Sequence, residues 1–241
     1  MSENYAIYSL VSSIRNEFNV NIDKAADISY LIEKLQIRLK EVHLSDGVLG
    51  SCKSVGRKRL ITVDPGIKYC NQKRFVIAHE IGHLLLHQNS YICKRDAFEM
   101  WRSKSSFEIE QEANSFAAEL LLPSKKVIEL LSKNDLTMSF LEQLSSLYEA
   151  SLTASAIAAI NVFRDKAILI CHKSREKIWS YNSSECYFSA NKNIPDTGGS
   201  GITKAEAWIS TDDDTISCEY ETKGFSNAGY SLTIVKIFQD N

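Results

Sequence analysis

The fold is decided by residues 75–87, which read Phe-Val-Ile-Ala-His-Glu-Ile-Gly-His-Leu-Leu-Leu-His. This stretch is apolar almost all the way round, and it predicts a buried helix over residues 75–88. His79 and His83 are four residues apart, so on a helix they share one face, with Cβ atoms about 5–6 Å apart. Two imidazoles at that separation can reach one metal ion.

Glu80 directly follows the first of these histidines and leaves the helix in another direction. From there its carboxylate can hold a metal-bound water rather than the metal itself. Burying His, Glu and His on one apolar helix is costly unless they have partners, and a divalent cation satisfies all three. The chain has five histidines, and His79, His83 and His87 all lie on this helix. The pattern therefore predicts a metal site.

Catalytic zinc usually takes three protein ligands and leaves a fourth position for water, so another segment must supply the third. The next predicted helix, residues 106–122, offers Glu108, Glu110, Glu112 and Glu119. Helical spacing puts Glu110 on a stripe of small and apolar residues, and the other three on the polar stripe. A carboxylate that faces the core needs a counter-charge. We therefore predict Glu110 as the third ligand and expect the other glutamates to face solvent.

Other readings of the histidines remain open. His87 continues the metal-binding face by one turn. It could contact a group behind the ligands, but a packed or hydrogen-bonded side chain is favoured. His43 and His172 have no motif around them. An inert structural metal site is the alternative to a catalytic one, but such sites usually fill all four positions with protein ligands. A purely structural metal site does not require a glutamate next to the first histidine, so a catalytic site is favoured.

The segment before the metal helix combines helices with a sheet. Apolar spacing predicts helices over residues 5–18 and 28–39. Strand-like runs follow at residues 37–44, 48–54 and 59–63. Asp and Gly or Pro and Gly pairs punctuate these runs, so we expect a small antiparallel sheet.

The chain changes in character after Pro123, which ends the helix of residues 106–122. Two or three helices are expected over residues 124–163. Beyond residue 165 five runs have the pattern of strands: residues 167–171, 178–181, 205–210, 215–221 and 230–238. Residues 191–201, rich in Asn, Gly and Pro, predict a long loop between them.

Composition excludes several classes of function. The net charge is −2, so no broad basic field favours nucleic acid or an anionic membrane. No run approaches the eighteen apolar residues of a membrane span, and the first residues lack the pattern of a signal peptide. The six cysteines are scattered and contain no CxxC pair, as expected of reduced thiols. We expect a soluble cytoplasmic protein.

Residues 75–87, followed by Glu-Gln-Glu-Ala-Asn-Ser-Phe-Ala-Ala-Glu-Leu-Leu-Leu-Pro at 110–123, resemble the ImmA/IrrE family of metallopeptidases. The family pattern is HExxH, then ExxAN-x-FA, then leucines and a proline, and the likeness covers roughly residues 25–125. It implies Zn²⁺ as the cofactor and Glu110 as the third ligand, the residue that helical spacing also favours. It also implies that the short sheet lines the cleft and that substrate adds along its edge as an extended strand.

The resemblance implies a zinc-dependent endopeptidase that makes limited cuts in a cytosolic protein. Family members often cleave a helix-turn-helix transcriptional repressor and so switch on genes of mobile elements, stress responses or defence. Others belong to toxin–antitoxin pairs. Zinc would polarise the scissile carbonyl, and Glu80 would take a proton from the attacking water and pass it to the leaving amine. Tyr91 is a candidate for stabilising the oxyanion, with an ordinary surface tyrosine as the alternative.

The predicted class is therefore α+β, in three parts. Residues 1–123 form a zincin-like helical peptidase core with a small antiparallel sheet. Residues 124–165 form a helical, helix-turn-helix-like segment, and residues 166–241 form a strand-rich C-terminal domain. That domain either stabilises the catalytic part or serves in sensing or substrate docking, since loops on a rigid sheet often carry binding.

A DNA-binding regulator with a non-catalytic metal site is the main competing function. Residues 137–148 and 151–163 are spaced like a helix-turn-helix. Between residues 123 and 165, however, the sequence contains four basic and five acidic residues. A surface that contacts phosphates normally carries a basic excess. Packing or protein binding is therefore the favoured role of these helices, and nucleic acid is not expected as the main partner.

Overall fold

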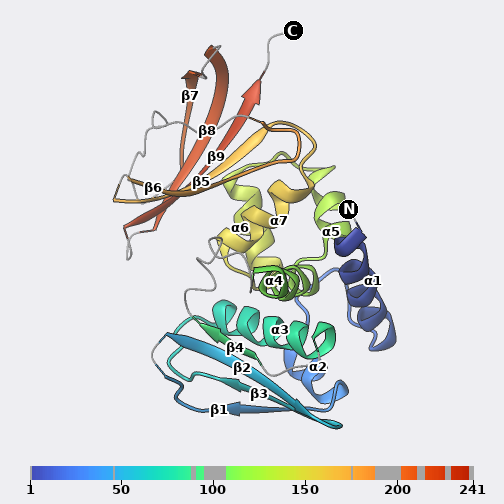
Figure 1. Ribbon diagram of the computed structural model, residues 1–241. Helices are drawn as coiled ribbons and strands as arrows, with labels where there is room; N and C mark the ends of the chain where they lie inside the picture. Colours follow the sequence, from blue (N-terminus) through green and yellow to red (C-terminus); the bar gives the residue numbers. More distant parts are fainter. Residues whose placement is uncertain are drawn as a thin grey trace. The chain divides into compact units, whose positions relative to one another are not determined.

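A computed structural model describes residues 2–45, 47–87, 91–94, 107–174, 176–187, 202–210, 215–225 and 229–238. The fold is α+β, and the chain divides into two compact units (Figure 1). The first unit comprises Met1–Pro123 together with Leu147–Ser151. The second comprises Ser124–Ser146 and Leu152–Asn241. None of the helices among the described residues is long and apolar enough to cross a membrane.

The described part of the first unit contains helices packed on a four-stranded sheet. Its helices are α1 (Ser2–Glu17), α2 (Ile28–Lys34), α3 (Cys70–Leu86) and α4 (Phe107–Leu121). Its strands are β1 (Ile37–Glu41), β2 (Val48–Val55), β3 (Lys58–Val63) and β4 (Tyr91–Lys94). Figure 1 shows α3 lying between the sheet and α4.

The sheet has the order β1-β3-β2-β4, which differs in one pairing from the predicted antiparallel sheet. β2 pairs antiparallel with β3 and with β4, whereas β1 pairs parallel with β3. β4 occupies the free edge of β2, so β1 takes the far edge of β3 instead. β4 was not predicted, because its four residues are too few to show an alternating pattern.

The connection between α2 and β1 resolves an overlap between the predicted helix 28–39 and the predicted strand 37–44. α2 begins at an N-cap, Asp27, whose carboxylate accepts a hydrogen bond from the backbone N–H of Tyr30. It ends at Lys34, well before residue 39. Gln36 then adopts a φ of 54°, a left-handed conformation that stops the helix and turns the chain into β1.

α3 is the central element of the first unit. Nine consecutive residues, from Val76 to Leu84, are buried, so the helix is enclosed on all sides as its all-round apolar pattern predicts. Its apolar side chains join one core with residues of α1, α2, the sheet and α4. The polar side chains His79, Glu80 and His83 are buried within this helix.

Residues far apart in the chain also hold the first unit together. Arg15 of α1 is buried and donates hydrogen bonds to the carbonyl oxygens of Asn21 and Leu120. The fully buried Tyr148 donates its hydroxyl to the carbonyl oxygen of Ile22 over 2.8 Å. These hydrogen bonds join α1 to the end of α4, and the segment after α1 to the end of α6.

The described part of the second unit contains helices and an antiparallel sheet. Its helices are α5 (Ser124–Leu131), α6 (Met138–Tyr148), whose last residues belong to the first unit, and α7 (Leu152–Val162). Its strands are β5 (Ala167–Lys173), β6 (Glu176–Asn182), β7 (Ile202–Ser210), β8 (Thr215–Phe225) and β9 (Tyr230–Phe238). The strand order is β6-β5-β9-β8-β7, with every neighbouring pair antiparallel.

The described part of the second unit contains three helices, where two or three were predicted, and five strands, as predicted. α7 packs against β5 and β6, and the buried carboxylate of Glu221 in β8 accepts a hydrogen bond from the backbone N–H of Met138 at the start of α6. Residues 149–151 join α6 to α7, and Glu149 has a φ of 50°. The predicted loop at residues 191–201 lies outside the described residues.

Candidate metal centre

Two helices bring three potential metal ligands together. α3 places His79 and His83 on one face, with their Nε2 atoms 2.9 Å apart. α4 places Glu110 opposite them, with Oε2 3.2 Å from His79 Nε2 and Oε1 3.4 Å from His83 Nε2. The ligand atoms all lie within 4.8 Å of one another. The predicted ligands thus converge on one point.

A close approach of α3 to α4 allows this convergence. A Cβ atom added to Gly82 would lie 3.2 Å from the Cα of Ala113 and 3.1 Å from the Phe116 ring. The two helices therefore touch almost backbone to backbone directly before His83, between the two histidines. A larger residue at position 82 would push α4, and Glu110 with it, away from α3.

Glu80 lies fully buried on the side of α3 that faces the sheet. A Cβ added to Gly50 of β2 would lie 2.8 Å from Glu80 Oε1 and 2.7 Å from Val76 Cγ1. The glycine therefore lets β2 pass directly over the carboxylate. Sequence reasoning missed Gly50, because the contact between β2 and α3 is tertiary and has no local pattern.

Burial changes the acid–base properties of Glu80. Removal from water raises its pKa from 4.5 to about 7, although the neighbouring His79 acts in the opposite direction. The thiol of Cys52 in β2, a weak donor, contacts the carboxylate and favours its ionised form. A buried carboxylate with this pKa can exchange a proton near neutral pH.

Charges at the candidate ligands suit a cation. Burial alone would raise the pKa of Glu110, but its close contacts with the imidazoles of His79 and His83 outweigh burial and hold the pKa at about 2. Glu110 is therefore ionised. Burial lowers the pKa of His83, which favours the neutral imidazole that metals bind.

The outer nitrogen of His79 has a hydrogen-bond partner on α4. His79 Nδ1 lies 2.9 Å from Oδ1 of Asn114, one turn beyond Glu110. When the amide oxygen accepts a proton from Nδ1, the lone pair of Nε2 remains directed at the convergence point. Asn114 thereby fixes the orientation and the tautomer of His79, as partners of metal-binding histidines usually do.

His83 has a different partner at its outer nitrogen. Its Nδ1 lies 3.0 Å from Nδ1 of His87, and Nε2 of His87 lies 2.7 Å from Oε2 of Glu112. The expectation that Glu112 faces solvent is therefore wrong in part, since its half-exposed carboxylate binds a histidine. Sequence spacing misplaced this contact because α3 ends at Leu86. His87 is extended, with φ −123° and ψ 134°, so its side chain leaves the helical track.

The other residues considered from the sequence, Glu108, Glu119 and Tyr91, are not among the three converging ligands. Glu108 is exposed, as expected, whereas Glu119 is half-buried and interacts electrostatically with Arg15. Tyr91 begins β4, but its side chain lies outside the part of the chain that the structure describes.

The donor set fits a divalent cation of the zinc type. Two imidazole nitrogens and one carboxylate are the ligands of many hydrolytic zinc sites, and they leave a fourth position open. Apart from the imidazoles beside Glu110 and the Cys52 thiol beside Glu80, the buried Oε2 of Glu110 and both oxygens of Glu80 have no hydrogen-bond partner among the described residues. Buried polar atoms without partners are costly, and a cation with its water would satisfy them.

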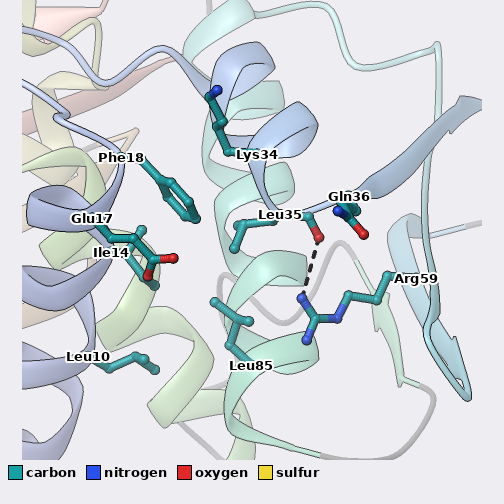
Figure 2. Close-up of a pocket in the computed structure, with 9 residues that line it drawn as sticks. All are labelled: Leu10, Ile14, Glu17, Phe18, Lys34, Leu35, Gln36, Arg59 and Leu85. Atoms are coloured by element: carbon teal, nitrogen blue, oxygen red, sulfur yellow. Dashed lines mark hydrogen bonds between the residues drawn. The ribbon is translucent and has the colours of Figure 1, made fainter.

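A separate open pocket shares no residue with this cluster. It has a volume of about 370 Å³ and lies among α1, α2, β3 and α3 (Figure 2). Leu10, Phe18 and Leu85 give it an apolar floor, and Arg59 at its rim donates to the carbonyl oxygen of Leu35 over 3.4 Å. No set of metal-binding side chains lines it, so the candidate chemistry lies at the histidines.

A family model and one solved structure are similar to this chain. The model of a peptidase family, Peptidase_M78 or IrrE N-terminal-like domain, matches residues 34–158, more than half of the chain. No protein with a curated description matches. Among solved structures, a Mycobacterium tuberculosis transcriptional regulator is similar with a TM-score of 0.63 and 10% identity, over 99% of this chain and 88% of that chain. At this identity the likeness shows the fold alone.

Proposed function

We propose that this chain, which belongs to the peptidase family of IrrE N-terminal-like domains, is a zinc-dependent endopeptidase that makes limited cuts in a protein partner. The convergence of His79, His83 and Glu110, with Glu80 buried beside them, carries the proposal. The family supports a metallopeptidase. We add to this that the metal is zinc, that the protein is catalytically active and that its substrate is a protein partner.

In the proposed mechanism, His79, His83 and Glu110 hold the zinc ion. Bound zinc supplies a Lewis acid for the scissile carbonyl and lowers the pKa of water. Glu80 accepts a proton from the attacking water on a carboxylate oxygen and delivers it to the nitrogen of the leaving amine. Its raised pKa suits both steps.

The proposed substrate is an extended segment of a folded cytosolic protein. β4 forms one edge of the sheet, and its neighbour β2 passes over Glu80 at Gly50. An edge strand offers unpaired backbone groups, so a peptide can add beside it without much reading of its side chains. A folded partner exposes few such segments, which favours one or a few cuts. The resemblance to repressor-cleaving relatives favours a helix-turn-helix repressor as this partner.

The experiment compares protein N-termini in cells that express the wild type or Glu80→Gln. A small set of new N-termini that appears only with the wild type, within a regulatory protein, supports the proposal. Identical sets from the two proteins would contradict it. Digestion of casein as fast as by a digestive protease would contradict a dedicated partner.

A DNA-binding regulator is the second candidate function. α6 and α7 lie at helix-turn-helix-like spacing, and the similar structure named above is called a transcriptional regulator. The acidic excess between residues 123 and 165 opposes phosphate contacts. A gel shift that weakens steeply with salt would favour this candidate. Loss of the gel shift in all conditions would favour packing or protein binding as the role of these helices.

A further inference from the structure

A continuous chain of hydrogen bonds links the surface of α4 to the candidate metal site. The carboxylate of Glu112 contacts His87, and His87 contacts the outer nitrogen of His83. His87 is nearly buried, with 8% of its side chain exposed, whereas 37% of the Glu112 side chain is exposed. This series of hydrogen bonds therefore begins near solvent and ends at a candidate ligand.

The atoms in contact determine where each proton lies. A carboxylate only accepts, so Nε2 of His87 donates its proton to Oε2 of Glu112 over 2.7 Å. A neutral His87 then has its lone pair on Nδ1 and accepts from Nδ1 of His83 over 3.0 Å. With its proton on Nδ1, His83 presents the Nε2 lone pair to the convergence point.

We propose that His87 and Glu112 are positioning residues of the metal site, acting in series to fix the ring orientation and tautomer of His83. This inference rests on the proposed function for the identity of the metal. It extends that function by adding two residues that do not touch the ion. The two histidine ligands are thus oriented differently, His79 by the neutral amide of Asn114 and His83 by a carboxylate through a second imidazole.

A plain ion pair between Glu112 and His87 is the competing explanation. Such a pair on a protein surface contributes little to stability and would not affect a ligand atom on another residue. The end of α3 favours the positioning role. The chain leaves the helix at His87, and this extended residue reaches both α4 and the preceding turn of α3.

The test measures zinc affinity by competition with a chelator. Loss of a hydrogen-bond partner behind a metal-binding histidine typically lowers affinity about 10–100-fold, and we expect this loss for His87→Ala. Glu112→Ala should lower affinity less. The double variant should lose no more than His87→Ala alone, because the two residues act in series. Glu108→Ala, which removes an exposed carboxylate from the same helix, is the matched control and should bind zinc like the wild type.

Two further measurements separate positioning from packing. His87→Gln can accept from His83 and donate to Glu112, so it should recover part of the affinity that His87→Ala loses. Nitrogen-15 NMR of histidines in the zinc-loaded wild type should find the His83 proton on Nδ1 and the His87 proton on Nε2. Unchanged affinity in His87→Ala and Glu112→Ala, fully independent losses in the double variant, or a His87 proton on Nδ1 would each overturn the proposal.

These measurements need no substrate. Zinc affinity that depends on His87 and Glu112 in a protein without peptidase activity would support the positioning role and contradict the proposed function. Peptidase activity with zinc affinity independent of both residues would support the proposed function and contradict the positioning role.

Discussion

The backbone of Ala113 lies directly against Gly82, because a Cβ on Gly82 would come within 3.2 Å of the Ala113 Cα. In an open helix Gly→Ala gains about 1 kcal/mol, but overpacking a core costs about 1–3 kcal/mol. We expect Gly82→Ala to lower the free energy of unfolding by up to about 2 kcal/mol and to weaken zinc binding by moving Glu110. Urea unfolding and chelator competition measure both. A more stable variant with unchanged zinc affinity would show that α4 is not held by this contact.

Substitution of the proposed ligands should separate metal binding from turnover. His79→Ala, His83→Ala and Glu110→Ala should each lose the single zinc ion expected per chain. Glu80→Gln should keep the zinc and lose turnover, because it removes only the proton acceptor. Elemental analysis of the purified variants measures the metal. Wild-type zinc content in Glu110→Ala, together with its loss in Glu112→Ala, would show that the third ligand is wrongly assigned.

Gly50 should prove essential for the position of Glu80. The added Cβ of Gly50→Ala would collide with Glu80 Oε1 and Val76 Cγ1, so either β2 or the carboxylate must move. We expect turnover to fall at least about tenfold, the equivalent of about 1.4 kcal/mol in the barrier, with zinc retained. Ser51→Ala on the same strand is the control. Equal turnover of Gly50→Ala and Ser51→Ala would contradict a role for this close approach.

The buried Glu80 should make the stability of the metal-free protein depend on pH. Its pKa is 4.5 in the unfolded reference and about 7 in the folded protein, so the folded state binds the extra proton between these values. Its stabilising contribution is full below pH 4.5 and is lost as the pH rises through 7. At about 1.4 kcal/mol per pKa unit, the loss approaches about 3 kcal/mol.

The measurement for this prediction is urea unfolding in the presence of a chelator at pH 5 and pH 8, for the wild type and Glu80→Gln. The variant cancels contributions from the other titrating groups, because Gln stays neutral at both values. The stability of the wild type should fall relative to the variant on going to pH 8. A constant difference between the two proteins would show that Glu80 titrates normally.

Short-range periodicity allowed much of the fold and of the candidate site to be predicted. The spacing of His79 and His83 depends only on helix geometry, and the face of α4 that carries Glu110 follows from its small and apolar neighbours. The strands β5 to β9 were recognisable because each contains a run of alternating or continuous apolar residues. Such features are local, and the sequence displays them directly.

Tertiary features could not be predicted in this way. The parallel pairing of β1 with β3 depends on which edge β4 leaves free, and β4 itself is too short to recognise. The contact between His87 and Glu112 arises where a helix ends and its 3.6-residue period no longer applies. Gly50 matters only because β2 crosses α3 at Glu80. Each of these features depends on how separate helices and strands pack against one another.

The first unit is not contiguous in the chain, and this has a consequence for its synthesis. Tyr148, fully buried, bonds to the carbonyl oxygen of Ile22, and Arg74 of α3 forms an ion pair with Glu149. A nascent chain released only as far as Pro123 contains every proposed ligand but lacks these contacts. Domains generally fold as units as they emerge from the ribosome. The first unit therefore gains these contacts only once residues 147–151 have emerged as well.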